Sequence, residues 1–233
     1  MAERKVYPAR LAAGADIDLR GTPLSDRLFH SLLDALRDSS ATGHPQLGTA
    51  RFESAVFEST AWFEQAIFTG PALFTSATFR HEAWFQAAAF EDTASFENAL
   101  FEHHAGFQEA VFESTAHFAS ATVDGKAQFV KTTFEGTAEL TSMTLNDTAC
   151  FEEAAFRISA RFDETTFSGT ASFAAAVFEC DIRLGAVAFQ GPAWFDGATL
   201  KGAPVTVAAF EGYPGFEGYP GFEAPNFQPT AHF

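Results

Sequence analysis

Two sets of side chains that could bind a partner recur along this chain at one constant interval, which separates Glu91 from Glu113 and Trp62 from Trp84. The first set is acidic and the second is aromatic. A row of carboxylates attracts basic surfaces, and exposed aromatic side chains are enriched among the residues that dominate protein interfaces. The candidate interaction surface therefore consists of Glu91, Glu113, Glu135, Glu179, Trp62, Trp84 and Trp194. For the tryptophans, a consensus residue of the repeat is the commoner explanation.

Histidines are the other residues that could support chemistry. His81 and His103 are separated by the same interval, and His104 follows directly, so these imidazoles could bind a metal ion. Exposed histidines copied by duplication of a repeat are the simpler interpretation, and we favour it. The sequence has no glycine-rich phosphate loop, paired-cysteine motif or nucleophile elbow. We therefore expect a non-enzymatic protein with no catalytic residue, metal or cofactor.

The spacing of the phenylalanines predicts the structural elements that position these residues. Of the 29 phenylalanines, all but Phe29 lie on one lattice with alternating spacings of five and six, beginning at Phe52. Most lattice residues have a small residue two positions earlier, usually alanine. Neither a helix nor an ordinary strand has this period. A repeat this short predicts a solenoid, in which each unit buries its ring against copies of itself. The remaining lattice positions are also apolar: Val123, Leu140, Leu145, Leu184, Leu200 and Val205.

The alternation of five and six predicts the number of sides. Four sides give a constant coil of about 22 residues, as a solenoid repeat requires, whereas three sides would give coils of unequal length. Two sides would give a flattened coil too thin for two rings. We therefore expect an all-β solenoid, a four-sided β-helix with four repeat units per coil and a phenylalanine core. The predicted core includes Phe63, Phe74, Phe85, Phe96, Phe107, Phe112, Phe118 and Phe129.

The pattern resembles the pentapeptide-repeat family, whose units carry a small residue two places before a central Leu or Phe. Ala-Trp-Phe-Glu-Gln (61–65) and Ala-Ile-Phe-Thr-Gly (66–70) show this pattern. The resemblance covers about residues 50–233 and implies a right-handed four-sided β-helix. The family's usual coil consists of four units of five, so the extra residue in every second unit must enlarge a corner here.

The two ends differ in sequence. Residues 1–49 form an N-terminal segment, in which 22–38 are predicted to be a capping helix with Thr22 as the cap and Pro23 at the first helical position. The β-helix is predicted to cover 50–233. From about residue 211 the coils become proline-rich, which weakens edge pairing. No capping helix is predicted at that end, so two copies could associate there as a homodimer.

Charge is concentrated on the repeat. Residues 1–51 have a net charge of +1 and the rest of the chain carries −17, which together give the total of −16. Direct binding to nucleic acid or to an anionic membrane is therefore not expected, and a basic protein surface is the favoured partner. The sequence has no apolar run of transmembrane length. Cys150 and Cys180 lie in different predicted columns, so we expect no disulfide and a cytoplasmic location.

Two functions follow from these features. The first is a rigid acidic rod that binds a basic protein surface. The resemblance adds a narrower version, because gyrase-protecting members of the family are similar to a DNA duplex in size and charge and occupy the DNA-binding saddle of a type II topoisomerase such as DNA gyrase. The alternative is a structural scaffold or assembly protein with no target related to nucleic acid, on which the acids only prevent lateral aggregation.

Overall fold

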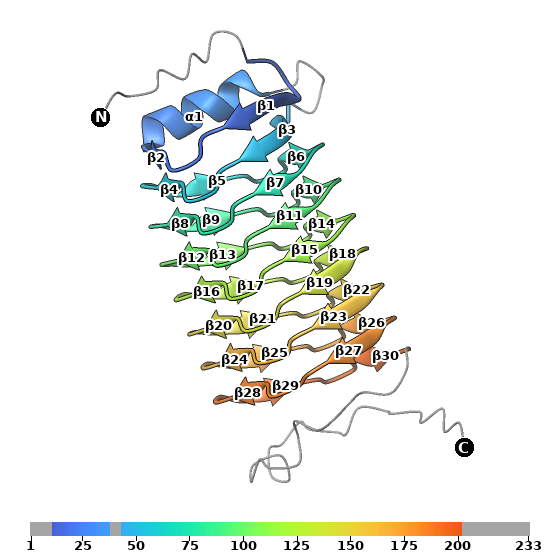
Figure 1. Cartoon of the computed structure of the whole chain (residues 1–233). Coiled ribbons are helices and arrows are strands. Elements are labelled where there is room, and N and C mark those ends of the chain that lie inside the picture. Colours follow the sequence, from blue (N-terminus) through green and yellow to red (C-terminus); the bar gives the residue numbers. More distant parts are fainter. Residues whose placement is uncertain (1–10, 38–42, 202–233) are drawn as a thin grey trace, which may run out of the picture.

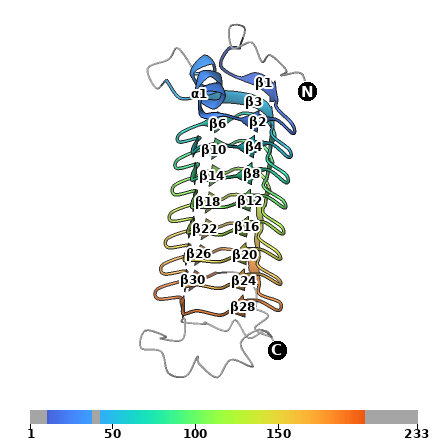
Figure 2. The same ribbon diagram turned by 90° about the vertical axis from the view of Figure 1, so that its left-hand side faces the viewer.

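The computed structural model describes residues 11–37 and 43–201, which form a parallel β-solenoid with one short helix at its N-terminal end (Figure 1). Strands of consecutive coils pair in register and lie about 22 residues apart along the chain. Phe90, for example, pairs with Phe68 and Phe112. The predicted coil length is therefore confirmed, and about seven coils stack into the described rod (Figure 2).

Each coil has four strands, and we number the four faces of the rod in chain order. Face 1 consists of β3 (Gln46–Arg51), β7 (Ala72–Leu73), β11 (Ala94–Ser95), β15 (Ala116–His117), β19 (Thr137–Glu139), β23 (Ser159–Arg161) and β27 (Asp181–Arg183). Face 2 consists of β2 (Pro23–Leu24), β4 (Val56–Phe57), β8 (Thr78–Phe79), β12 (Leu100–Phe101), β16 (Thr122–Val123), β20 (Thr144–Leu145), β24 (Thr166–Phe167) and β28 (Ala188–Phe189).

Faces 3 and 4 form the other two sides of the four-sided rod. Face 3 consists of β5 (Ala61–Trp62), β9 (Ala83–Trp84), β13 (Ala105–Gly106), β17 (Ala127–Gln128), β21 (Ala149–Cys150), β25 (Ala171–Ser172) and β29 (Ala193–Trp194). Face 4 consists of β6 (Ile67–Phe68), β10 (Ala89–Phe90), β14 (Val111–Phe112), β18 (Thr133–Phe134), β22 (Ala155–Phe156), β26 (Val177–Phe178) and β30 (Thr199–Leu200). Strand β3 is longer and pairs with both β6 and β7, so it joins faces 4 and 1.

The interior is filled by phenylalanine rings stacked along each face. The rings of Phe68 and Phe90 are parallel to within 3°, with centroids 4.8 Å apart. Between faces the rings meet edge to face, as in Phe85 and Phe96 at 5.2 Å and 82°. Both arrangements are favourable for aromatic quadrupoles. All eight predicted core phenylalanines are buried, and so is the alanine two positions before most rings.

The corners explain the alternation of five and six. After faces 1 and 3 the chain makes a tight turn, as when the Ala55 N–H donates to the Phe52 carbonyl at 3.0 Å. The third residue of this turn, Ser54, has φ of 57°, which is typical of a type II turn. The left-handed residue recurs every eleven positions as far as Gly197. After faces 2 and 4 the corner is one residue longer, so this is where the extra residue predicted from the sequence lies.

The N-terminal segment adds strands to the sheets of the rod and covers the N-terminal end of the rod with a helix. Strand β1 (Ala15–Asp18) pairs with β3, and β2 pairs with β4, so both extend the sheets by one level. Helix α1 (Asp26–Ala35) lies across this end (Figure 1). Phe29, the one phenylalanine off the lattice, packs edge-on against Phe57 and Phe63 with centroid distances of 5.6 and 5.0 Å.

The helix differs from its prediction. It begins at Asp26 after the N-cap residue Ser25 and ends at Ala35, so it is shorter than the predicted range 22–38. Thr22 is not the cap, and Pro23 is not in the helix. The physical reason is that the chain around Pro23 is extended, so that its carbonyls accept N–H groups of β4 that a helix would leave unpaired.

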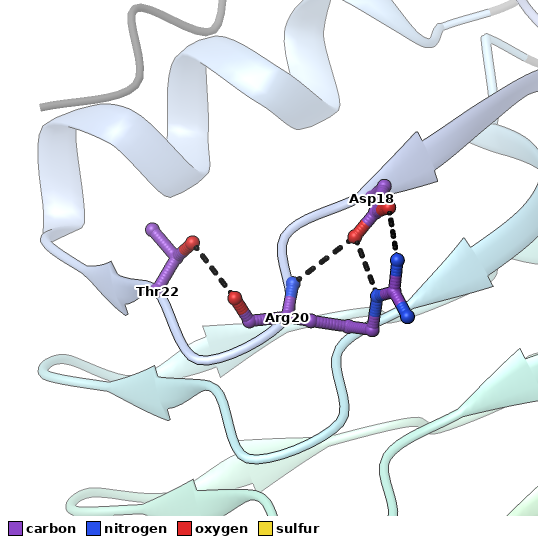
Figure 3. A network of polar contacts seen from close by, with 3 residues as sticks. All are labelled: Asp18, Arg20 and Thr22. Atoms are coloured by element: carbon purple, nitrogen blue, oxygen red, sulfur yellow. Dashed lines mark hydrogen bonds and ion pairs between the residues drawn. The ribbon is translucent and has the colours of Figure 1, made fainter.

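The turn between β1 and β2 is fixed by local polar contacts (Figure 3). Arg20 Nε and Nη2 donate to the two carboxylate oxygens of Asp18 at 2.9 and 2.8 Å. This paired hydrogen bond raises the pKa of Arg20 above its usual value. The Thr22 hydroxyl donates to the Arg20 carbonyl at 3.4 Å. These contacts hold the chain as it passes from face 1 to face 2.

The proline-rich coils predicted from about residue 211 lie outside the described residues, as does the proposed dimer contact at that end. Within residues 11–37 and 43–201, no helix is long and apolar enough to cross a membrane.

We expect Phe112→Ala to lower the free energy of unfolding by about 3–5 kcal/mol, because the buried ring stacks between Phe90 and Phe134 at 4.6 and 5.0 Å. Chemical denaturation measures this change. The matched control is Val111→Ala, on the same strand but half-exposed, which should cost no more than about 1 kcal/mol. Equal effects of the two variants would contradict the assignment of the ring column as the core.

The left-handed corners give a second prediction. Ala87 has φ of 53°, whereas Ala89 lies on strand β10 with ordinary backbone geometry. Both Ala→Gly changes increase the entropy of the unfolded chain equally, but only Ala87→Gly relieves left-handed strain. Ala87→Gly should therefore be more stable than Ala89→Gly by about 1–2 kcal/mol, as thermal unfolding would show. Two variants of equal stability would mean that the corner is unstrained.

Candidate interaction surface

The residue before each ring points outward, so each face displays one column of side chains. On faces 2 and 4 these columns are uncharged, with valine, isoleucine, leucine, alanine and threonine between β4 and β30. Face 1 instead carries charged residues in its later coils, and face 3 carries the tryptophans. The charged and aromatic positions predicted from the sequence therefore belong to faces 1 and 3 and to the corners.

The predicted acidic row lies at the wide corner between faces 4 and 1. Its members each follow the last residue of a face 4 strand, and because these strands pair in register, the row runs along the rod. All of them are exposed. In order along the rod the row contains Glu91, Glu113, Glu135, Arg157, Glu179 and Lys201.

Two of the four glutamates of this row have ion pairs. Arg157 Nη1 lies 2.6 Å from Glu179 Oε2, and Arg157 Nε lies 3.9 Å from Glu135 Oε1. Lys201 Nζ also lies 3.2 Å from Glu179 Oε1. The hydrogen bonds from Arg157 and Lys201 hold the pKa of Glu179 below its usual value. Glu91 and Glu113, by contrast, have no ion pair with any described residue.

The same division applies to the whole rod. Residues 52–124 carry eleven acidic residues against one arginine, a net charge of −10, whereas 125–201 carry ten acidic against six basic residues, a net charge of −4. Within the described rod, the ion pairs of these acids all begin at or after the contact between His117 and Glu139, whose Nδ1 and Oε2 are 2.8 Å apart. None of the acids of 52–124 therefore has an ion pair with a described residue, whereas four of the ten acids of 125–201 do: Glu135, Glu139, Glu153 and Glu179.

The tryptophans lie in one column on face 3, as their spacing predicted. Trp62 and Trp84 are direct partners on β5 and β9, and 43% of Trp62 is exposed. Trp84 extends over Gly106, where an added Cβ would meet the indole Cε3 at 2.3 Å. Trp194 stands in the same column at the far end, paired with Ser172. The sequence alone did not reveal that Gly106 provides the space for Trp84.

Face 1 carries a column of residues of both charges, which is not part of the candidate surface. His117 Nδ1 contacts Glu139, and Arg161 Nη1 contacts the other carboxylate oxygen of Glu139 at 3.3 Å. These side chains pair because residues of opposite charge lie one coil apart in the same column. These contacts link three neighbouring coils. The next residue of the column, Arg183, is in register with Arg161 and has no ion pair with a described residue.

Two of the histidines form a stack. His81 and His103 lie nearly parallel with centroids 5.8 Å apart, as their spacing predicted. His104 Nδ1 accepts a hydrogen bond from the Lys126 N–H at 2.8 Å, so this nitrogen already has a partner. Among the described residues, no three His, Cys, Asp or Glu side chains converge on a possible metal position.

Both cysteines are free thiols. Cys150 lies in the tryptophan column of face 3, and Cys180 is buried at a wide corner. Burial, together with the nearby carboxylate of Glu152, raises the pKa of Cys150 to about 11. Burial and Asp181 likewise raise the pKa of Cys180 to about 11. Neither thiol is therefore an activated nucleophile.

The comparisons with known proteins agree with this geometry. Residues 63–111 match the family model of pentapeptide repeats in nine copies. No curated protein and no solved structure matches the chain. The matched residues lie on the coils between β6 and β14, whose regular repeat continues to the end of the described rod.

We expect both thiols to resist alkylation. At pH 8, iodoacetamide should modify them about a hundredfold more slowly in the native protein than in urea, because only the thiolate reacts and an unfolded cysteine has a pKa near ~8.5. Cys150→Ser and Cys180→Ser assign the two rates, and rapid labelling at pH 8 would contradict the burial of the thiols.

The raised pKa values also predict a pH dependence of stability, because unfolding lowers both of them. The contribution of the two thiols to the free energy of unfolding should be fully present below about pH 8.5 and should be lost as the pH rises toward 11.

Proposed function

We propose that this pentapeptide-repeat protein is a non-enzymatic interaction module whose acidic rod binds a basic protein surface. The observation that carries the proposal is the division of charge along the rod. None of the eleven acids of residues 52–124 has an ion pair with a described residue, and only one arginine lies among them. In residues 125–201, four of the ten acids are paired, and six basic residues offset part of the acidic charge. Because free carboxylates produce a negative field outside the molecule, the first coils are the part suited to a cationic partner.

The density of this charge supports a narrower version of the proposal. At about 4.8 Å per coil, residues 52–124 extend over about 16 Å. Their net charge of −10 corresponds to about one charge per 1.6 Å of rod axis, and duplex DNA carries one charge per ~1.7 Å. Residues 125–201 carry only about one charge per 4 Å, from a net charge of −4. A protein that binds DNA electrostatically is therefore the basic partner that the first coils fit best.

The rod is rigid, so we expect it to bind a partner without changing its own conformation. Each coil is joined to the next by backbone hydrogen bonds on all four faces, and the rings beneath are stacked. The outward carboxylates consequently keep fixed spacings, and little conformational entropy is lost on binding. A DNA-binding saddle such as that of a type II topoisomerase is the kind of target we propose.

Charge reversal tests the proposal. We expect Glu91→Lys with Glu113→Lys to weaken binding to a purified basic DNA-binding protein by at least about tenfold at low salt, because two local charges change sign. The matched control is Asp181→Lys with Asp196→Lys, which makes the same change in net charge on exposed acids of the later coils. Raising ionic strength should weaken wild-type binding through screening. Equal losses in the two double variants would contradict a site on the first coils.

A supercoiling assay with DNA gyrase at fixed DNA concentration tests the narrower version. Titration with this protein should inhibit the enzyme, and excess DNA should relieve the inhibition, because the two would compete for one cationic saddle. No effect at tens of micromolar protein, together with intact binding to other basic proteins, would reject the topoisomerase target. Absence of binding to any basic protein would favour the scaffold.

A further inference from the structure

We propose that Trp62 and Trp84 on face 3, together with Glu64 and Glu82, form a docking site for arginine side chains of the partner. This inference rests on the proposed function and specifies which side chains of a basic partner are recognised. The two indoles stand side by side on the paired strands β5 and β9. They lie on the coils whose carboxylates lack ion pairs, so the aromatic surface and the free negative charge coincide.

The indoles are placed to receive a ligand rather than to complete the core. Their side chains belong to the outward column, and the interior of these coils is already filled by Phe63 and Phe85, which are fully buried. Trp62 keeps 43% of its surface exposed. Trp84 leans over Gly106, which has no side chain to displace it. Burying an exposed indole against a partner would remove a large apolar surface from water.

A carboxylate lies at each corner that bounds the face of the two indoles. Glu82 precedes Trp84 by two residues, at the wide corner where the chain enters face 3, and Glu64 follows Trp62 by two, at the tight corner where the chain leaves it. Thr60 Oγ1 donates to Glu82 Oε2 at 3.2 Å, which fixes that carboxylate. A hydrogen bond from its own backbone N–H lowers the pKa of Glu82, so the group remains ionised at neutral pH. Neither glutamate has an ion pair with a described residue.

Arginine is the cation that fits this combination. Its planar guanidinium stacks on an indole face and donates two parallel hydrogen bonds to a carboxylate, which a lysine ammonium does not match. It is also less strongly hydrated than an ammonium, so its transfer onto an aromatic surface costs less. Two indoles beside two carboxylates therefore predict a preference for arginine over lysine at equal charge.

Face 3 offers a control at its other end. Trp194 and Asp196 repeat the positions of Trp62 and Glu64 six coils later. There the paired neighbour is Ser172 instead of a second indole. The far end therefore has the same residue types in the same column but lacks the aromatic pair, so it should not show the preference.

The experiment compares an eight-residue arginine peptide with a lysine peptide of equal length, titrated into the full chain at low salt. A Trp194→Phe background makes the tryptophan emission report on Trp62 and Trp84 alone, and calorimetry provides the dissociation constants. We expect the arginine peptide to bind several-fold more tightly and to change the emission. Each indole should contribute about two- to fivefold in affinity, so Trp62→Ala with Trp84→Ala should remove the preference.

The outcomes separate this inference from the function on which it rests. Trp194→Ala should leave both dissociation constants unchanged, and an unaltered melting temperature of the double alanine variant would show that the rod is intact. If both peptides bind equally, or if Trp194→Ala has the same effect as the double variant, the docking site is wrong while the acidic rod still binds cations. If neither peptide binds at low salt, the proposed function is rejected as well.

Discussion

Every other feature of this molecule depends on the stacking of identical rings at the spacing of paired β-strands. Parallel strands lie about 4.8 Å apart, and the ring centroids along a face repeat this distance, as in Phe79 and Phe101 at 4.6 Å. The rings stack only if every coil contains the same number of residues, because a single insertion would shift one column against the next. The constant coil length is therefore a packing requirement, and the corners must satisfy it.

The corners satisfy it by alternating two solutions. The tight turn places a non-glycine residue in the left-handed region at thirteen positions, which costs energy at each one. The N–H of this residue still donates to the next coil, as Ala87 does to Gln108 at 2.8 Å, so the turn does not interrupt the ladder. The wide corner avoids the strain and carries most of the polar side chains. The surface chemistry therefore concentrates at the wide corners because the backbone is least constrained there.

The sequence predicted the solenoid, the coil length, the four sides and the buried rings, because each follows from one strict period. It did not predict the start of α1, since Pro23 and Leu24 satisfy both a helix-start pattern and a strand, and only the unpaired edge of β4 decides between them. The candidate surface was predicted as a set of columns. The sequence did not show that Arg157 neutralises Glu135 and Glu179 while Glu91 stays unpaired. The spacing of residues predicts which side chains share a column, but their conformations decide which of them form ion pairs.

The position of the free charge on the rod has a physical explanation in the core beneath it. Like charges stacked one coil apart destabilise the rod by about a few tenths of a kcal/mol each, so the coils with the largest net charge, residues 52–124, depend most on a strong interior. From Phe52 to Phe118 every lattice position is phenylalanine, and the first smaller residue is Val123. Leu140, Leu145 and Leu184 follow in the coils where basic residues offset part of the acidic charge. The uninterrupted aromatic stack therefore underlies the part of the rod with the largest net negative charge, where the interior offsets the repulsion at the surface.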